Sequence, residues 1–177
     1  MSLLSIQLYG SPILNSKTAK VETLPPDFST ILDDMFETMY ADDGIGLSAN
    51  QVGIPLSFFV ADFSLHDETG RKMVFINPEI LEYQGEVAAE EGCLSVPEIR
   101  EEVIRAEKVK VRYQDVELNV HTEEFSGYYA RVVQHETDHL SGIYFVDRIS
   151  RLKRSFIASK LKRLAGDAKK RLTIQVG

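Results

Sequence analysis

The sequence predicts a single α+β domain in which antiparallel strands surround a central helix that carries a His-Glu-x-x-His (HExxH) motif, with an N-terminal helix and a C-terminal helix. Apolar residues recur at helical spacing in three segments, 28–39, 128–143 and 149–164. Between the first two segments, short β-like runs alternate with turn residues. We expect residues 1–177 to form one domain, because the chain suits one hydrophobic core and shows no repeat or long linker.

The first predicted helix follows an irregular segment, residues 1–26, which is punctuated by Ser11-Pro12 and Pro25-Pro26. Asp27 is a suitable N-cap for it. The apolar residues with helical spacing are Phe28, Ile31, Leu32, Met35, Phe36 and Met39. The pattern ends at residues 41–44, and the chain beyond is too rich in glycine to continue a helix.

Several strands are predicted in the middle of the chain. Residues 56–60 and 73–76 read as a strand pair joined by a turn at 67–70, and Asn77-Pro78 is expected to break the second strand. Strand-like sequence resumes at 79–88. Further strands are expected from Val103 to Tyr113, with residues 116–121 pairing back through Gln114-Asp115.

The C-terminal part combines a short apolar run at 143–146 with a basic amphipathic helix at about 149–165. Residues 148–177 hold ten Lys and Arg against one acid, a charge of +9, whereas the rest of the chain carries −16. This basic segment is either a solvated helix face or a docking surface for an anionic partner. Gly166 is expected to end the helix. The inward residues are predicted to be Leu152, Phe156, Ile157, Leu161 and Leu164.

The central helix carries the strongest chemical signal. His135 and His139 are four residues apart, so both imidazoles project from one face and can bind the same metal ion. Glu136 can reach a water molecule bound to that metal. Because a catalytic metal site usually has three protein ligands and a position for water, one further ligand is required.

The sequence after the motif offers few third ligands. In the extended pattern His-Glu-x-x-His-x-x-Gly-x-x-His, Gly142 fits the glycine, but Phe145 occupies the last position and cannot bind metal. No glutamate follows the motif, and Asp147 and Asp167 are the only acids beyond it. The third ligand is therefore expected upstream, unless Asp147 supplies it.

Cys93 is the single cysteine and cannot form an internal disulfide. It is either a small buried apolar residue or a reactive or metal-ligating thiol. Gly92 allows close approach of the backbone and Pro97 ends regular pairing, which favours the second role.

The glycine-rich residues 44–53 superficially resemble a phosphate-binding loop. No strand precedes them and no Lys-Ser/Thr pair follows, so nucleotide binding is not favoured. Gln51 in this segment is a neutral donor that can polarise a carbonyl group.

Together these three segments resemble the peptide deformylase family. The family carries the motifs Gly-x-Gly-x-Ala-x-x-Gln, Glu-Gly-Cys-Leu-Ser and Gln-His-Glu-x-Asp-His in this order, and this chain has them at residues 44–51, 91–95 and 134–139. The second and third motifs match fully, whereas Ser48 replaces the usual alanine of the first. The resemblance implies the same fold, with the strand of Cys93 packed beside the central helix.

The resemblance implies a metal-dependent hydrolase that removes the formyl group from the N-terminal formyl-methionine of newly made polypeptides and releases formate. Cys93, His135 and His139 would be the metal ligands, and Glu136 would be the general base for a metal-bound water. Two rival interpretations stay open on the residues alone. One is a metallopeptidase, and the other is a structural metal site completed by His66, His121 or an acid.

The resemblance also implies an oxyanion site formed by the metal, the Gln51 side chain and the Leu94 backbone N–H. One divalent metal ion per chain is expected. Cysteine with two histidines suits zinc, whereas the resemblance implies Fe²⁺ as the native metal, with Zn²⁺, Ni²⁺ or Co²⁺ possible in preparations.

The resemblance implies eight substrate-binding positions. Val132 suits the apolar wall of a methionine pocket, and the stem of Arg131 is expected to pack there while its charge faces water. Glu91 and Arg100 have a simpler alternative, a surface ion pair. The full set is Ile45, Gly46, Glu91, Gly92, Arg100, Tyr128, Arg131 and Val132.

The composition favours a cytoplasmic protein without membrane or DNA partners. No apolar run is long enough to cross a membrane, and residues 1–6 lack the basic and apolar regions of a secretory signal. A single unpaired cysteine suits a reducing compartment. The resemblance implies that the basic C-terminal helix docks on the ribosome, close to the nascent chains that would be the substrates.

Overall fold

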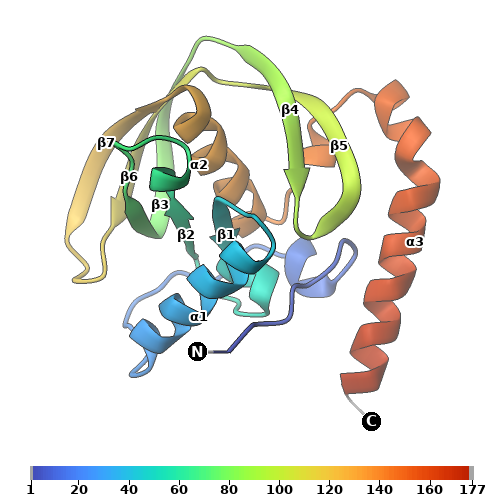
Figure 1. The fold of residues 1–177 in the computed structure, drawn as a ribbon, viewed down its shortest axis with the longest axis horizontal. Helices are drawn as coiled ribbons and strands as arrows, with labels where there is room; N and C mark the ends of the chain where they lie inside the picture. Colours follow the sequence, from blue (N-terminus) through green and yellow to red (C-terminus); the bar gives the residue numbers. More distant parts are fainter. Residues whose placement is uncertain (1, 176–177) are drawn as a thin grey trace.

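The computed structural model describes residues 2–175 and confirms the α+β architecture. Five antiparallel strands form one sheet in the order β1-β2-β3-β6-β7 (Figure 1). They are β1 Gly46–Ser48, β2 Phe58–Asp62, β3 Lys72–Gln84, β6 Lys108–Gln114 and β7 Val120–Ser126. The remaining strands, β4 Val87–Cys93 and β5 Val96–Arg105, form a separate hairpin that arches from the sheet towards the C-terminal helix (Figure 1).

Helix α2, Gly127–Leu140, contains the His-Glu-x-x-His motif and lies between the sheet and the hairpin, as predicted. Its apolar residues Ala130, Val133 and Leu140 pack with aromatic residues of β2 and β3, including Phe59 and Phe75, in one buried cluster. Since β7 leads directly into α2, both the chain connection and the core fix this helix on the sheet.

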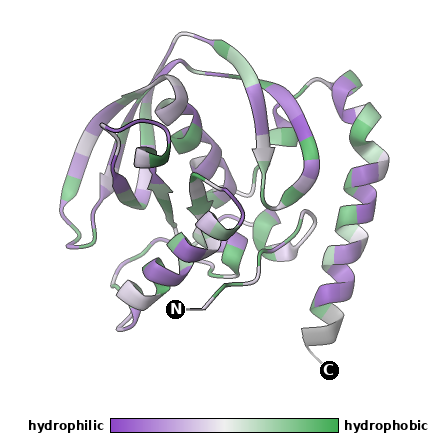
Figure 2. Ribbon diagram, in the orientation of Figure 1, coloured by the Kyte–Doolittle hydropathy of each residue, from purple (hydrophilic) through white to green (hydrophobic). Residues whose placement is uncertain are grey.

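Helix α1, Phe28–Ala41, confirms the first predicted helix. Its buried residues pack with β2 in a second cluster, while β2 itself is apolar along most of its length (Figure 2). The chain then enters β1 and the 3-10 turn η2, Ala49–Val52, neither of which was predicted, because segments this short carry no periodic signal. The other 3-10 turns are η1 Pro12–Asn15, η3 Phe63–Leu65 and η4 Phe145–Asp147.

The expected break at Asn77-Pro78 is wrong, because β3 continues through both residues. The pairing of β3 with β6 shifts register between Ile76 and Glu79, and Asn77 has φ +51°. A bulge of this kind tolerates a proline and a left-handed residue within a strand. The Asn77 side chain fixes the bulge by bonding both the N–H and the C=O of Val21 at 2.8 Å.

The returning strand begins later than predicted. Residues 116–119 form a turn, and β7 starts at Val120. Leu118 has φ +64°, and the Asp115 carboxylate accepts from the N–H groups of Glu117 and Asn119 at 3.0 and 2.9 Å. An Asp that caps its own turn in this way competes with strand pairing, which explains the displacement.

Helix α3, Arg151–Gln175, runs past the predicted end at Gly166. Leu164 and Ala168 are both buried on either side of this glycine, so packing holds the helix together where propensity alone disfavours it. Two predicted inward residues are wrong, because Leu152 and Phe156 are 66% and 76% exposed. The buried stripe is instead Ile157, Leu161, Leu164 and Ala168.

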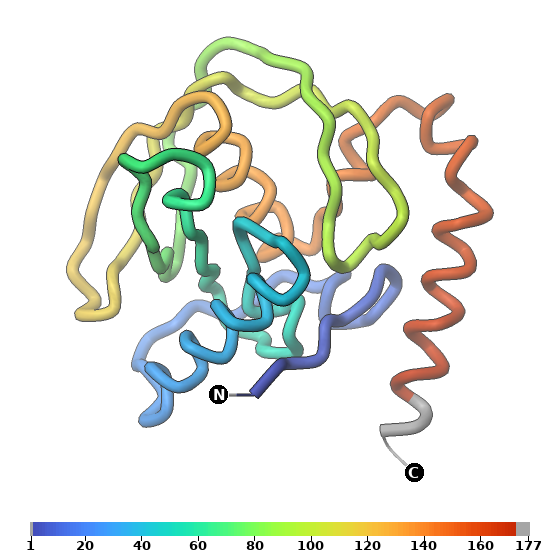
Figure 3. Tube along the Cα trace, viewed as in Figure 1, coloured from blue at the N-terminus to red at the C-terminus, as the bar shows by residue number. Residues whose placement is uncertain are grey.

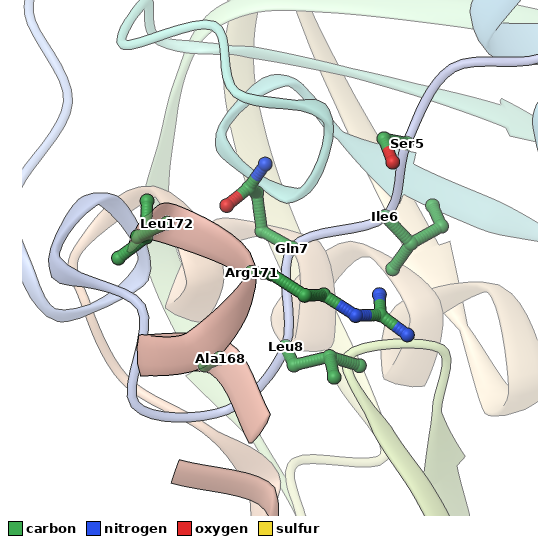
Figure 4. Close-up of a pocket in the computed structure, with 7 residues that line it drawn as sticks. All are labelled: Ser5, Ile6, Gln7, Leu8, Ala168, Arg171 and Leu172. Atoms are coloured by element: carbon green, nitrogen blue, oxygen red, sulfur yellow. The ribbon is translucent and has the colours of Figure 1, made fainter. Parts of the chain in front are cut away.

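The N-terminal segment ties the site-bearing loops to α3 (Figure 3). The Gln7 N–H donates to the Gln51 carbonyl at 2.7 Å, and the Tyr9 N–H donates to the Ser95 carbonyl at 2.8 Å. Figure 4 shows Arg171 of α3 extending over this segment. The space of about 20 Å³ left between segment and helix has room for about one water molecule.

In the described part of the chain, every helix is too short or too polar to cross a bilayer.

Two glycine substitutions test the docking of α3. Gly10 has φ +92°, and a Cβ there would lie 2.7 Å from the Cβ of Ala165, so Gly10→Ala should lower the free energy of unfolding by about 1–3 kcal/mol. Gly166→Ala adds a Cβ into open space within the same helix and should raise it by up to about 1 kcal/mol. Urea unfolding measures both, and a Gly10→Ala variant as stable as the parent would contradict this packing.

Candidate metal centre

Three side chains converge on one point beside α2. The Sγ of Cys93 lies 3.1 Å from Nε2 of His139, which lies 3.3 Å from Nε2 of His135. One ligand atom from each of the three residues falls within 4.8 Å of the other two. The two histidines lie on consecutive turns of α2, on the same face of the helix, whereas the cysteine is the last residue of β4.

The hairpin turn aims the cysteine at the helix. Cys93 pairs with Val96, and the register of the hairpin shifts between Gly92 and Cys93. Such a shift turns the following side chain out of the regular strand alternation. Cys93 contacts the apolar cluster around β5 and α3 and is the free thiol of the chain, so it is held in place without a disulfide.

The Glu91 carboxylate supports the first histidine. Its Oε2 accepts from Nδ1 of His135 at 2.9 Å, so Nδ1 carries the proton and the Nε2 lone pair faces the other two ligand atoms. Arg105 binds both oxygens of Glu91, with Nε to Oε1 at 2.8 Å and Nη2 to Oε2 at 3.0 Å. Burial alone would raise the pKa of Glu91, but the bonds from His135 and Arg105 outweigh burial and hold its pKa well below the usual range.

A second carboxylate continues this network. Asp138 Oδ2 accepts from Nη1 of Arg105 at 2.6 Å and from Nε of Arg148 at 2.9 Å. The sequence analysis did not predict that Arg105 binds Glu91 and Asp138, and it assigned no role to Asp138. Asp138 is part of the third motif and had a weak signal, whereas a single arginine at the end of a strand had no signal.

Glu136 is buried beside the ligands. Its Oε2 has no hydrogen-bond partner within residues 2–175, and burial raises its pKa to about 7. A Cβ on Gly46 would lie 2.7 Å from Glu136 Oε1, so only glycine at this position of β1 leaves the carboxylate its space. The predicted glycine motif therefore has a steric function here rather than a phosphate-binding one.

Gln51 is held next to the cysteine. Its Oε1 accepts from the Ser48 N–H at 2.9 Å and from the Ser48 hydroxyl at 2.8 Å. Its Nε2 donates to Ser95 Oγ at 3.1 Å, with Cys93 Sγ 3.6 Å away. Ser48, which replaces the usual alanine of the motif, thus orients the amide so that its N–H groups face Cys93 and Ser95.

The predicted substrate-binding residues have different surroundings in the structure. Gly46 borders Glu136, and Tyr128 is partly exposed and stacks on His66. Arg100 is exposed, 3.8 Å from the carboxylate of Glu90. Gly92 lies beside the Arg100 side chain. Ile45 and Val132 pack in the apolar cluster between α2 and the sheet, and Leu94 packs against the cluster that contains the buried residues of α1.

The expectation that the charge of Arg131 faces water is wrong. Arg131 is 6% exposed, and its Nη1 donates to Glu91 Oε1 at 2.6 Å. Glu91 is likewise buried, which excludes the simple surface ion pair for this residue. The two opposite charges, one from α2 and one from β4, pair directly, which offsets part of the cost of burying each of them.

The alternative ligands lie elsewhere. Asp147 accepts from the Tyr144 N–H and pairs with Arg154. His121 bonds Asp115 at 2.6 Å, and His66 stacks on Tyr128. Within the described residues, the group able to hold a metal is Cys93, His135 and His139 alone, which leaves coordination positions for water and substrate.

Comparison with known proteins shows which family the chain resembles. Residues 3–155 match the family model described as polypeptide deformylase. The chain is 43% identical over 170 residues to the peptide deformylase of Nitrobacter hamburgensis, covering 93% of this chain and 97% of that relative. It is 46% identical over 167 residues to that of Pseudothermotoga lettingae, covering 93% and 94%. The crystal structure of peptide deformylase from Thermus thermophilus superposes with a TM-score of 0.86 at 40% identity, covering 94% and 99%.

Proposed function

The chain belongs to the polypeptide deformylase family and removes the N-formyl group from new polypeptides, and we propose that Cys93, His135 and His139 hold its catalytic metal while Glu136 moves the proton. The convergence of one sulfur and two imidazole nitrogens beside a buried carboxylate carries this proposal. We propose that the whole chain is one catalytic domain.

The donor set fits a divalent metal. Ligand atoms of a tetrahedral ion with bonds of about 2.0–2.3 Å lie roughly 3.3–3.8 Å apart. The separations of 3.1 and 3.3 Å around His139 are close to that range. The bond from His135 Nδ1 to Glu91 leaves Nε2 unprotonated, as a metal ligand requires.

When bound, the metal supplies a Lewis acid that polarises the formyl carbonyl and acidifies the attacking water. Glu136 accepts a proton from that water as the new C–O bond forms. The oxyanion accepts hydrogen bonds from Gln51 Nε2 and the Leu94 backbone N–H. Glu136 then returns the proton to the departing amine, the C–N bond breaks, and formate leaves the free N-terminus.

The substrate side chain is expected to be methionine, bordered by Ile45, Tyr128 and Val132. Gly92 and Arg100 lie on the hairpin that flanks the ligands and are proposed to contact the peptide. We leave Arg131 and Glu91 out of that set, because their side chains are buried and paired with each other.

We propose Fe²⁺ as the native metal, with Zn²⁺, Ni²⁺ or Co²⁺ able to replace it. An iron–thiolate site reached by water should lose activity in air, whereas a nickel-loaded sample should not. Equal persistence of activity for both forms in air would argue against iron.

Formate release from formyl-Met-Ala-Ser by anaerobically metal-loaded protein tests the assignment. Cys93→Ser should lose bound metal and activity together. Glu136→Gln should keep the metal but lose roughly 10²–10⁴-fold in turnover, because it removes the base alone. Full turnover by Glu136→Gln would contradict its role, and cleavage of internal peptide bonds without formate would favour a metallopeptidase.

Gly46→Ala tests the space reserved for Glu136. The new Cβ would displace the carboxylate, and misplacement by about 1 Å can cost roughly 10²-fold in kcat/KM. Metal content should stay unchanged. Gly166→Ala is the matched control, since its Cβ meets nothing within 4 Å. Wild-type kcat/KM in Gly46→Ala would show that Glu136 is not confined by β1.

We further propose that the enzyme works in the cytoplasm and that α3 docks on ribosomal RNA. The support is charge, since α3 carries exposed lysines such as Lys160 and Lys162, which can pair with phosphates. Replacing these two lysines by glutamate should weaken cosedimentation with ribosomes, whereas the same change at exposed Lys17 and Lys20 should not. Equal cosedimentation of both variants would count against docking through α3.

A further inference from the structure

We propose that Arg131 is a positioning residue for the metal site, which fixes the hairpin that carries Cys93 against the helix that carries both histidines. The inference rests on the proposed metal site. The hydrogen bonds of Arg131 go to none of the three ligand atoms. It acts through Glu91 and through the backbone of β4 and β5.

The metal ligands come from two separately packed units. Helix α2 packs on the five-stranded sheet, whereas the hairpin belongs to a second sheet. The hairpin residues Val96, Ile99 and Val103 pack with η4 and α3 in a different cluster, which Cys93 also contacts. The distance from thiol to imidazoles therefore depends on whatever joins the hairpin to α2.

At the base of the hairpin, Ala106 packs in the apolar cluster of α2, but the two units are apart beside it. A cavity of about 420 Å³ lies there, bordered by Ile104 and Ala106 on the hairpin side and by Thr137 of α2 and Ser141, which follows the helix. Figure 1 shows the corresponding arch of β4 and β5 over α2. Charged side chains span this gap, with Arg105 reaching from β5 to α2.

Arg131 forms a second charged link between the two units, and its side chain extends from α2 to the hairpin. From α2, its Nη2 donates to the Val87 carbonyl of β4 at 2.7 Å, and its Nη1 donates to the Val103 carbonyl of β5 at 3.0 Å. Nη1 also donates to Glu91 Oε1 at 2.6 Å. One guanidinium thus holds both strands of the hairpin and the carboxylate between them.

The Glu91 carboxylate has no acceptor position to spare. Oε1 accepts from Arg105 and Arg131, and Oε2 accepts from Arg105 and His135, so four donors fill about four lone-pair sites. Arg131 and His135 lie on consecutive turns of α2. The carboxylate bridges these turns and cannot rotate away from Nδ1 of His135 while Arg131 is in place.

The geometry requires arginine. Three acceptors lie in different directions around a planar fork, whereas a lysine ammonium is one point charge on a flexible stem. Arg131→Lys should therefore keep the charge but lose part of the linkage. Arg131→Met keeps most of the apolar volume and loses all three bonds.

Cobalt binding to the full-length apoprotein under anaerobic conditions tests the proposal. The thiolate-to-cobalt absorption band reports the Cys93 bond, and chelator competition gives Kd. Arg131→Met should bind Co²⁺ roughly tenfold or more weakly, with Arg131→Lys between it and the parent. In the zinc-loaded protein, the NMR signal of the His135 Nδ1 proton should shift upfield and exchange faster in Arg131→Met.

Arg154→Met is the matched control. Arg154 also binds a carboxylate and a backbone carbonyl, those of Asp147 and Val146, but it does not contact Glu91. It should leave the cobalt Kd and the His135 signal unchanged even where stability falls. If Arg131→Met fails to fold, Arg131→Lys decides by the same two readouts.

A folded Arg131 variant with the parent's cobalt Kd and His135 signal would overturn the inference. A parent protein that binds cobalt without a thiolate band would instead contradict the metal site itself. The two failures are therefore distinguishable, because only the second affects the unsubstituted chain.

Discussion

The site depends on the hydrogen bonds that the buried Glu91 carboxylate accepts from Arg105, Arg131 and His135. Glu91 is 5% exposed and would cost several kcal/mol to bury as an isolated charge. Two guanidiniums and one imidazole compensate this cost by filling its acceptor positions. In doing so they bring together a strand, a helix and the first metal ligand, which no single element of the fold would hold in register.

This arrangement divides the faces of α2 between different tasks. One face packs on the sheet through Ala130 and Val133 and makes the helix a rigid platform. The stripe of Arg131, His135 and His139 faces the hairpin and the proposed metal site. Asp138 extends the charged network towards Arg148, so the motif Gln-His-Glu-x-Asp-His holds the proposed ligands, the proposed base and a supporting carboxylate within two turns.

Local patterns in the sequence predicted what depends on local spacing. The i, i+4 pair of His135 and His139 and the amphipathic pattern of α1 required no tertiary information. Cys93 followed from its motif and from the lack of a third ligand downstream. The α+β class followed from the alternation of helical and β-like segments.

What escaped prediction depends on contacts distant in sequence. Arg131 and Glu91 are 40 residues apart, and their pairing is visible only once β4 lies beside α2. Leu152 and Phe156 fit a helical apolar pattern, but the hairpin covers a neighbouring stripe of α3 instead. A glycine such as Gly166 often ends a helix, but here the buried Ala168 beyond it keeps α3 packed and the helix continues.

The most direct test of this account is the zinc affinity of Glu91→Gln, measured by chelator competition at neutral pH. Glutamine keeps the size of the side chain but replaces one acceptor oxygen by a donor that opposes the arginines and His135. The account predicts a loss of roughly 10–100-fold in affinity in a variant that still folds. Parental affinity in folded Glu91→Gln would show that the ligands are positioned without this carboxylate.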